Sequence, residues 1–384
     1  MADGRLRNAA QTRVEEILDE VTASGEETGV QVAAYLDGEL VVDAWAGLAD
    51  VERGRPMEPE TLVPSWSTGK GIAAALVAVL VDRGMVGYDT PIAAHWPEFA
   101  ARGKSEITLG QVLSHSAGLP QLRPEVTPEE LFDVASVGDW LAGQAPLWEP
   151  GTANGYHGWT YGVLLAETLR RATGRTCDEL LREELAGPLG VAESLLFSVP
   201  DDLVGRVATC YDGGWSAYLD RMPPDSPFFT FAPRPVLPVA ALANRADFRR
   251  AALPANGTMT ARAAARVYAA LVCGELDGIR LVSDTTLKEA TTARTSGEDR
   301  SLGFLLVKGY GFMLGGAGSV VRSPDGGFGT NGSGGSAASA DPAHRFSFAV
   351  TKNRMSVNGL DRRLFREVRG ALGIGGAPTS TPLS

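Results

Sequence analysis

Lysine, histidine and cysteine are scarce in this sequence, which has five Lys, four His and three Cys among 384 residues. The cysteines, Cys177, Cys210 and Cys273, are widely spaced, with neither a C-x-x-C pair nor a nearby pair of histidines to complete a zinc site. This pattern predicts buried thiols in a reducing compartment. Basic residues number 35 against 46 acidic ones, and the net charge of −11 argues against nucleic acid or an anionic membrane as a partner.

Long apolar runs are lacking as well. The longest useful run, residues 72–81, is about half of the roughly 20 residues that a bilayer-spanning helix needs. The first 21 residues carry charge throughout and have no apolar core followed by a cleavage site, so we expect no secretory signal and a cytoplasmic protein. What is present, 44% apolar and 21% charged residues, is typical of a globular protein and excludes disorder, collagen and coiled coil. At roughly 150 residues per domain, the length predicts two to three structural units.

Strand patterns lie at the two ends of the chain. Apolar residues from Val14 to Val21 have helical spacing and predict an N-terminal amphipathic helix. A hairpin follows, because the β-rich runs 30–36 and 40–45 flank an Asp-Gly pair, which supplies the positive φ of a tight turn. Strand patterns return after Ser301 and precede a last helix; they cover residues 303–308, 310–314, 319–322, 335–340 and 346–352, with the helix at 360–372.

Helical patterns occupy the middle of the chain, at residues 72–82, 109–113, 129–144 and 161–172, with two more helices capped by Thr260 and Ser283 that end at Cys273 and at about residue 293. Strands at both ends with helices between them predict an α+β fold. An antiparallel sheet domain would be built from residues 8–65 and 300–374, and a mainly helical domain from residues 66–299. We expect the functional site in the seam between them, and a flexible tail at residues 375–384.

Residues 213–256 fit neither the helical nor the strand period. They contain seven prolines and the aromatic cluster Phe228, Phe229 and Phe231. A long loop without secondary structure is usually functional or disordered, and the aromatic residues argue against disorder. We predict that the three phenylalanines line an acyl or aromatic substrate pocket, with simple packing under a long loop as the alternative.

The tetrapeptide Ser67-Thr68-Gly69-Lys70 is an S-x-x-K pattern at the start of a predicted helix. Its spacing places the hydroxyl and the ammonium group one turn apart on the same face, beside the partial positive charge of the helix N-terminus. Both effects favour a lysine that gives up its proton and can then activate the serine. With 23 Ser and five Lys, chance alone yields roughly 0.3 such matches, so the pattern needs a second element for support.

That second element is the run Tyr156-His157-Gly158-Trp159-Thr160-Tyr161-Gly162, which fits the pattern Y-H-x-x-T-x-G. With it, the chain resembles the superfamily of serine β-lactamases and penicillin-binding proteins, and within it the esterase and transacylase branch related to class C β-lactamases, which includes family VIII carboxylesterases. Residues 107–120 and 328–336 support the resemblance, which extends over about residues 14–373.

The resemblance implies a β-lactamase/transpeptidase-like fold and a role for each matching residue. Ser67 would be the acylated nucleophile and Lys70 its base or proton relay. Tyr156 would lie opposite, its phenolate stabilised by Lys70, and would pass the proton to the leaving group. The backbone N–H groups of Ser67 and Ser333 would form the oxyanion hole. His157 would contact the substrate or hold the loop in place.

The third motif of the family is where this sequence departs from it. Lactamases have K-T-G at this point and the esterase branch often has H-x-G or W-x-G, whereas this sequence has Thr330-Asn331-Gly332. The three residues are predicted to border the substrate along a strand edge. A threonine has neither the positive charge that holds a substrate carboxylate nor the donor of an imidazole, which argues against a β-lactam or a D-alanyl peptide as substrate.

Together these observations predict a serine hydrolase or acyltransferase that acts on an ester, thioester or amide of a small molecule through an acyl-Ser67 intermediate. The chemistry requires no metal or organic cofactor; its partners are a small-molecule acyl donor and, for transfer, a second small molecule as acceptor. Two alternatives stay open. One is a β-lactamase or D-alanyl peptidase-like enzyme, and the other is a non-catalytic acyl-binding or sensing protein of the same fold, for which Thr330 is the one supporting feature.

Overall fold

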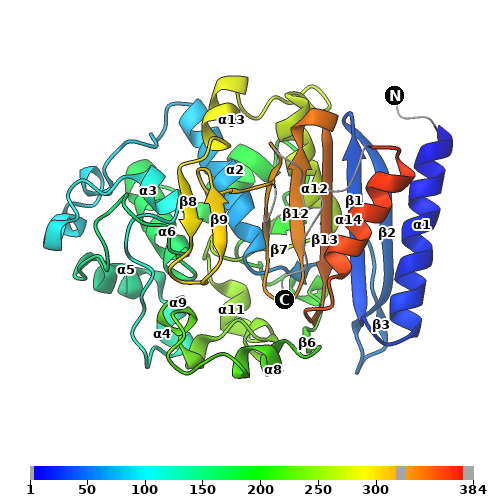
Figure 1. The fold of residues 1–384 in the computed structure, drawn as a ribbon, viewed down its shortest axis with the longest axis horizontal. Coiled ribbons are helices and arrows are strands. Elements are labelled where there is room, and N and C mark those ends of the chain that lie inside the picture. The colour runs from blue at the N-terminus through cyan, green and yellow to red at the C-terminus, as the bar shows by residue number, and fades with distance from the viewer. Residues whose placement is uncertain (1–3, 317–325, 375–384) are drawn as a thin grey trace.

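The computed structural model describes residues 4–316 and 326–374, and within them the central feature is a nine-stranded antiparallel sheet (Figure 1). Its strand order is β3-β2-β1-β13-β12-β11-β10-β9-β8. The two ends of the chain meet where β1 (Gly29–Leu36) pairs with β13 (Phe346–Lys352), over seven residue pairs from Val30–Lys352 to Leu36–Phe346. The α+β fold with a sheet built from both termini is therefore confirmed.

The remaining strands of the sheet are β2 (Glu39–Asp50), β3 (Arg55–Pro56), β8 (Thr295–Glu298), β9 (Leu305–Lys308), β10 (Met313–Leu314), β11 (Phe328–Asn331) and β12 (Ala337–Asp341). Four of them, β2, β9, β10 and β12, overlap predicted strands, whereas β3, β8 and β11 fall outside the predicted ranges. The predicted Asp-Gly turn joins β1 to β2, with positive φ of 50° at Asp37 and 81° at Gly38. β2 continues beyond its predicted end at residue 45, because it also pairs with β3. The strand predicted at 319–322 and the tail at 375–384 lie outside the described residues.

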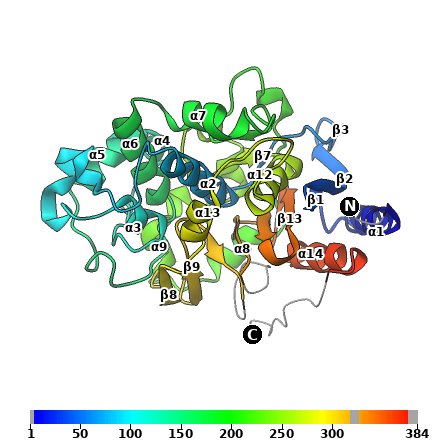
Figure 2. The same cartoon turned by 90° about the horizontal axis from the view of Figure 1, so that it is seen from above.

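Helices cover both faces of the sheet (Figures 1 and 2). α1 (Gly4–Ala23) and α14 (Leu360–Ala371) lie side by side on one face and bury their apolar residues against it. On the other face, α12 (Ala261–Cys273) packs against β1, β12 and β13, and α2 (Thr68–Asp82) packs against β11. The sequence places α12 in the helical domain, but its row of buried alanines lets it lie directly on the sheet.

The helical region beyond α2 contains α3 (Leu109–Leu113), α4 (Pro128–Phe132), α5 (Val134–Ala142), α6 (Thr160–Thr173), α7 (Cys177–Leu180), a π-helix (η3, Leu181–Ala186) and α13 (Asp284–Ala290), with 3-10 turns at Ile92–Ala94, Pro97–Gly103 and Val204–Arg206. The single helix predicted at 129–144 is wrong. Asp133 leaves the helical region at ψ 80° and instead caps α5 by accepting the backbone N–H of Ser136 at 3.1 Å. α13 ends at Ala290, earlier than predicted.

The prediction that residues 213–256 lack secondary structure is also wrong. They form α8 (Trp215–Asp220), α9 (Phe228–Phe231), a 3-10 turn (η5, Arg234–Val236), α10 (Ala240–Ala243) and α11 (Ala246–Arg250). None of these helices exceeds six residues, the length of α8. A periodic pattern needs a window of about 11 to 18 residues to be recognised, so helices this short leave no signal in the sequence.

Two small sheets lie beside the site described below. β4 (Val63–Pro64) and β5 (Leu195–Leu196) flank β7 (Thr258–Met259) in an antiparallel arrangement, and β14 (Arg354–Met355) runs parallel to β6 (Tyr211–Asp212). The first of these sheets fixes the chain just before residue 65 against the segment just after residue 257. The three cysteines are buried and free, as predicted. Within the described ranges, we find no helix long and apolar enough to cross a membrane.

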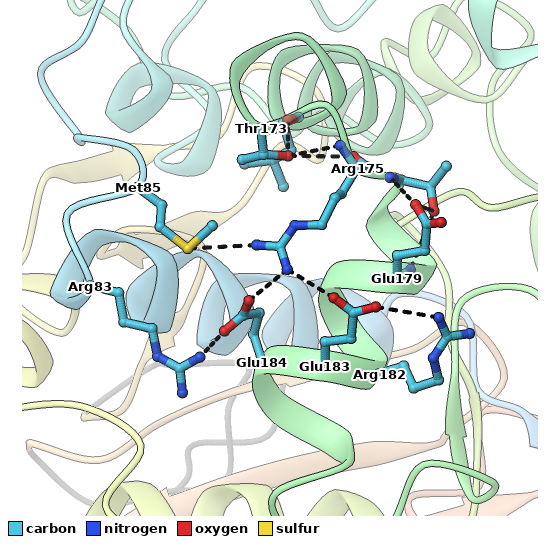
Figure 3. Close-up of polar contacts among 10 residues, drawn as sticks. Arg83, Met85, Thr173, Arg175, Glu179, Arg182, Glu183 and Glu184 are labelled. Carbon is cyan, nitrogen blue, oxygen red and sulfur yellow. Dashed lines mark hydrogen bonds and ion pairs between the residues drawn. The ribbon is translucent and has the colours of Figure 1, made fainter.

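The C-terminal end of α2 is held by a cluster of charged side chains (Figure 3). Arg83, directly after α2, pairs with Glu184 in the π-helix. Glu184 also pairs with Arg175 at 2.7 Å, and Arg175 reaches Glu183 at 2.9 Å and the Sδ of Met85 at 3.7 Å. The cluster therefore joins the turn after α6 and the π-helix to the end of the helix that carries the S-x-x-K pattern.

We expect Glu184→Gln to lower the melting temperature by about 2 °C without changing catalytic parameters, because Glu184 is mostly buried and pairs with two arginines. Glu183→Gln is the matched control. Its side chain is 47% exposed, so water already screens its pair with Arg175, and its melting temperature should change by less than about 0.5 °C. Equal shifts for the two variants in a thermal melt would contradict this account of the cluster.

Candidate active site

Ser67 stands at the N-terminal cap of α2, with helical φ −63° and ψ −6°. The residue before it, Trp66, has a positive φ of 51°, which is uncommon for a bulky residue. Trp66 is buried, and its ring packs against Phe248 at 5.0 Å and Trp159 at 6.3 Å between centroids. This packing holds the unfavourable backbone conformation and turns the half-buried Ser67 towards a cavity.

Lys70 lies one turn along α2, and its Nζ is 3.1 Å from the Oγ of Ser67. The side chain is 2% exposed, and its other polar partner is the carbonyl oxygen of Ala255 at 3.0 Å. Burial lowers the pKa of Lys70 to about 7, because the charged ammonium loses its hydration and no carboxylate replaces it. At neutral pH a substantial fraction of Lys70 is therefore a free amine next to the serine hydroxyl.

Gly69 allows this close contact between α2 and residues 253–257. A Cβ at position 69 would collide with the carbonyl group of Asn256. Without that side chain, the segment lies directly on the first turn of α2, and Ala255 can accept from Lys70. Position 69 between Ser67 and Lys70 is thus restricted to glycine for steric reasons.

Tyr156 lies on the loop before α6, and its hydroxyl interacts with the Ser67 side chain across the cavity that both residues line. The ring is buried, stacks on His115 at 4.8 Å and contacts Phe231 edge-on at 5.5 Å. The Nζ of Lys70 is 5.0 Å from its centroid. Burial, with a smaller contribution from the Asp299 charge, raises the pKa of Tyr156. The raised pKa favours a neutral phenol at rest, which can donate a proton, so the predicted phenolate beside Lys70 would form only during the reaction.

His157 does not fit the predicted contact with substrate. Its ring is fully buried and is not part of the cavity lining. Nε2 accepts the backbone N–H of Leu119 at 2.9 Å, which leaves the proton on Nδ1 to be donated to the carbonyl of Gly155 at 2.7 Å. Burial lowers the pKa of His157 to about 4. A neutral imidazole with both nitrogens bonded to backbone holds the Tyr156 loop rather than a ligand.

The third motif is divided between the cavity and the protein interior. Thr330 is buried behind α2, where its hydroxyl donates to the carbonyl of Thr68 at 3.0 Å and lies 3.4 Å from the hydroxyl of Tyr268. The predicted contact between Thr330 and substrate is thus corrected to a contact between β11 and α2. Asn331, Gly332 and Ser333 do line the cavity.

The cavity has a volume of about 450 Å³ and opens over Ser67. Most of its lining is apolar or aromatic, and the side chains come from α8, α9 and the segment 302–313 as well as from the site itself: Trp66, Trp159, Trp215, Tyr218, Met222, Phe228, Phe231, Leu302, Phe304 and Met313. Phe228 and Phe231 are placed as predicted. Phe229 is not part of the lining, since its ring faces the guanidinium of Arg234 at 4.4 Å. Among the lining residues that the structure describes, Lys70 is the one with a charged side chain.

Comparison with known proteins gives the family of this fold. The sequence profile of the Beta-lactamase family matches residues 14–372. The chain belongs to the Beta-lactamase family. Among family relatives, it is similar to the Esterase/beta-lactamase LipL of Mycobacterium tuberculosis, with 35% identity over 352 residues, or 85% of this chain and 77% of the relative. The resemblance inferred from the sequence motifs is therefore confirmed.

Two solved structures of this family superpose on nearly the whole chain. A family VIII carboxylesterase has a TM-score of 0.84 at 33% identity, with 94% of this chain and 97% of that one covered. A penicillin-binding protein homolog from Caulobacter crescentus has a TM-score of 0.81 at 34% identity, with 97% and 98% covered. The family thus includes chains described both as esterases and as penicillin-binding protein homologs, so the choice between these chemistries depends on the site.

Sequence reasoning missed a buried polar group behind Tyr156. Lys308, on β9, is 1% exposed and pairs with the fully buried Asp299 at 2.5 Å and with Asn154. It also missed the cavity residues outside 228–231, such as Trp215 and Met313. Lys308 could have been noticed, because it is one of only five lysines and lies in an apolar strand pattern. The cavity residues could not be recognised from the sequence, because an isolated apolar residue looks the same whether it lines a cavity or packs in the hydrophobic core.

Proposed function

We propose that this chain is a serine esterase that transfers the acyl group of a neutral, apolar ester to Ser67. The observation that carries the proposal is the contact of one serine hydroxyl with both a largely uncharged lysine and a neutral tyrosine at an apolar cavity. That the enzyme is a serine esterase of β-lactamase fold follows from the comparisons, since the similar chains include an esterase at 35% and a carboxylesterase at 33% identity.

The first half-reaction forms the ester of Ser67. The Oγ attacks the carbonyl carbon of the substrate while its proton moves to the neutral Nζ of Lys70. The tetrahedral intermediate then expels the alcohol, which takes a proton from the Tyr156 hydroxyl, and Lys70 returns its proton to Tyr156. Lys70 and Tyr156 are then in their starting states. Each has the protonation state its step requires at neutral pH, an amine that accepts and a phenol that donates.

The developing oxyanion would be held by the backbone N–H groups of Ser67 and Ser333. Both residues line the cavity, where their N–H groups would converge on the oxygen of the reacting carbonyl. Within the described part of the chain, neither N–H donates to another protein group, so both are available to a ligand. Fixed backbone donors of this kind lower the barrier most when they need no reorganisation.

In the second half-reaction, water or an alcohol attacks the acyl-enzyme carbonyl and passes its proton through Tyr156 to the neutral Lys70. The protonated Lys70 then gives this proton to the Oγ of Ser67 as that oxygen leaves, which restores the free serine. The same two residues serve both steps in reverse roles. An apolar cavity favours an organic acceptor over water where such an acceptor is present, which supports acyl transfer as a second outcome of the same mechanism.

A β-lactam or D-alanyl peptide substrate carries a carboxylate, and the part of the cavity lining that the structure describes offers no arginine or lysine to bind it besides Lys70, which the mechanism requires as a base. Thr330, at the position of the lactamase lysine, faces α2 instead. Burying an unpaired carboxylate in apolar surroundings is costly. The site therefore favours neutral esters over the substrates of penicillin-binding proteins.

The acyl preference gives a direct check on the cavity. In Phe228→Ala, the enlarged cavity should raise the ratio of kcat/KM for an octanoyl ester to that for a butyryl ester by roughly 10-fold, because about one aromatic ring of volume becomes free for the longer chain. Phe229→Ala removes the same volume outside the cavity and should leave the ratio within about twofold of the parent. A Phe229→Ala shift as large as that of Phe228→Ala would contradict the assignment.

The nucleophile is tested by intact-protein mass spectrometry after exposure to a fluorophosphonate, with p-nitrophenol release from a p-nitrophenyl ester recorded in parallel. We expect one label per chain and many turnovers for the parent and for the control Ser136→Ala, a serine exposed on α5, and neither for Ser67→Ala. Release of a single equivalent by the parent would support an acyl-binding or sensing protein instead. Unchanged labelling of Ser67→Ala would overturn the proposal.

A further inference from the structure

We propose that Lys308, Asp299 and Asn154 form a buried brace that positions Tyr156 for proton transfer. The inference rests on the proposed function, since it assigns a role towards a tyrosine that this function places in the reaction. The brace is not a catalytic group, because none of its three side chains lines the cavity. It acts through the backbone of the Tyr156 loop.

The hydrogen bonds of the brace converge on one loop. The Oδ1 of Asp299 accepts the backbone N–H of Tyr156 at 2.9 Å, and the Oδ2 of Asp299 accepts from Lys308 at 2.5 Å. Lys308 also donates to the Oδ1 of Asn154, two residues before Tyr156. The side-chain amide of Asn154 in turn donates to the carbonyl of Leu306 at 3.2 Å, and the backbone carbonyl of Asn154 accepts from the backbone N–H of Arg300 at 2.8 Å.

The brace therefore ties the Tyr156 loop to the hairpin β8–β9. Asp299 lies in the turn of that hairpin, where it also accepts the backbone N–H groups of Ser301 and Leu302 at 2.9 and 3.0 Å. A carboxylate with this many donors has a fixed orientation. Any displacement of Asp299 consequently moves the backbone of Tyr156. Proton transfer requires the Tyr156 hydroxyl to be positioned relative to Ser67 with a tolerance of roughly a few tenths of an ångström.

The energetic cost of the brace indicates that its role is not limited to stabilising the fold. A fully buried ion pair loses the hydration of both ions, and apolar side chains in its place are often at least as stable. The side chains of Lys308 and Asp299 are 1% and 0% exposed, so this pair bears that cost in full. Apolar side chains in the same place could not accept the backbone N–H of Tyr156. Lys308 also lies 6.0 Å from the centroid of the Tyr156 ring, so the pair is adjacent to the reacting group itself.

Two variants separate positioning from stability. Asp299→Ala removes the acceptor of the Tyr156 N–H, and we expect kcat to fall by roughly 30- to 100-fold with KM within about threefold, since a small displacement of a reacting group has effects of this size. In the double variant Asp299→Asn/Lys308→Gln, the amides can accept from Tyr156, bond each other and donate to Asn154 without any charge. It should recover kcat to within about fivefold of the parent.

Lys104→Met is the matched control for loss of a buried lysine. Lys104 is fully buried and donates to the carbonyls of Ala101, Ala142 and Gln144, none of which lines the cavity. Lys104→Met should lower the melting temperature while kcat of the folded protein stays within about twofold. Lys308→Met, by contrast, should lower both. Thermal melts of all variants give the folded fraction used to correct kcat.

The proposal is overturned if kcat of folded Asp299→Ala and Lys308→Met stays within about twofold of the parent, or if the double variant is as impaired as Asp299→Ala. If Asp299→Ala does not fold, Asn154→Ala takes its place, and kcat of Asn154→Ala is compared with kcat of the double variant. Failure of the proposed function is distinct, because the parent would then show no turnover that depends on Ser67. Turnover that depends on Ser67 but not on the brace would reject this inference alone.

Discussion

Replacement of Lys70 by methionine is expected to lower kcat for ester cleavage by roughly 10³- to 10⁴-fold, with KM changed by less than about threefold. Methionine has a similar length and suits the apolar surroundings, so α2 should stay intact while Ser67 loses the amine that lies 3.1 Å from its hydroxyl. The measurement is kcat and KM with a chromogenic ester. It should be corrected for the folded fraction and compared with the rate of Ser67→Ala.

The same lysine sets the expected pH dependence. Burial disfavours the ammonium form, so the pKa of Lys70 falls to about 7 and the amine predominates above that pH. Activity should therefore rise as the pH increases through about 7 and then reach a plateau. Because burial raises the pKa of Tyr156, deprotonation of the phenol should not lower activity at mildly alkaline pH. Lys308 and Asp299, which lie behind the Tyr156 loop, pair with each other.

Lys288→Met is the control for these experiments, because Lys288 is an exposed lysine on α13, away from the cavity. It should retain the rate and the pH profile of the parent. If Lys70→Met kept more than about a tenth of the parent kcat, Lys70 would not be the base. A parent profile that stays flat between pH 6 and 8 would equally contradict a base with a pKa near 7.

The parts of the site that were predicted from the sequence are those with local signals. Ser67 and Lys70 share one helical turn, and Tyr156 lies in a run of seven residues with a recognisable pattern. The roles of their neighbours depend on contacts between distant segments. Thr330 and Asn331 are adjacent on β11, and only the pairing of that strand with β12 decides that Thr330 faces α2 and Asn331 the cavity.

The same reason explains the errors on the fold. The strands β1 and β13 were predicted because their apolar runs are long, and the turn between β1 and β2 because Asp37-Gly38 has its own chemistry. The helices in 213–256 are too short for their period to be seen. Phe228 and Phe229 are neighbours of the same type, and only the tertiary structure distinguishes the one that lines the cavity from the one stacked on Arg234.

For Tyr156→Phe, we expect a loss of kcat that depends on the leaving group. The variant removes the hydroxyl that meets Ser67 and keeps the ring that stacks on His115 and contacts Phe231. An alkoxide leaving group needs a proton, so kcat for an ethyl ester should fall by roughly 10²- to 10³-fold. A p-nitrophenolate leaves without one, and for its ester the fall should be about 10-fold or less.

The comparison between the two esters separates the role of Tyr156 from that of Lys70, whose loss should affect both esters alike because the attack of Ser67 is common to them. Tyr88→Phe is the control. Tyr88 is a buried tyrosine outside the cavity whose hydroxyl has no hydrogen-bond partner among the described residues, so loss of that hydroxyl should leave both rates unchanged. Equal losses for the ethyl and p-nitrophenyl esters in Tyr156→Phe would place the tyrosine in the activation of Ser67 instead of in protonation of the leaving group.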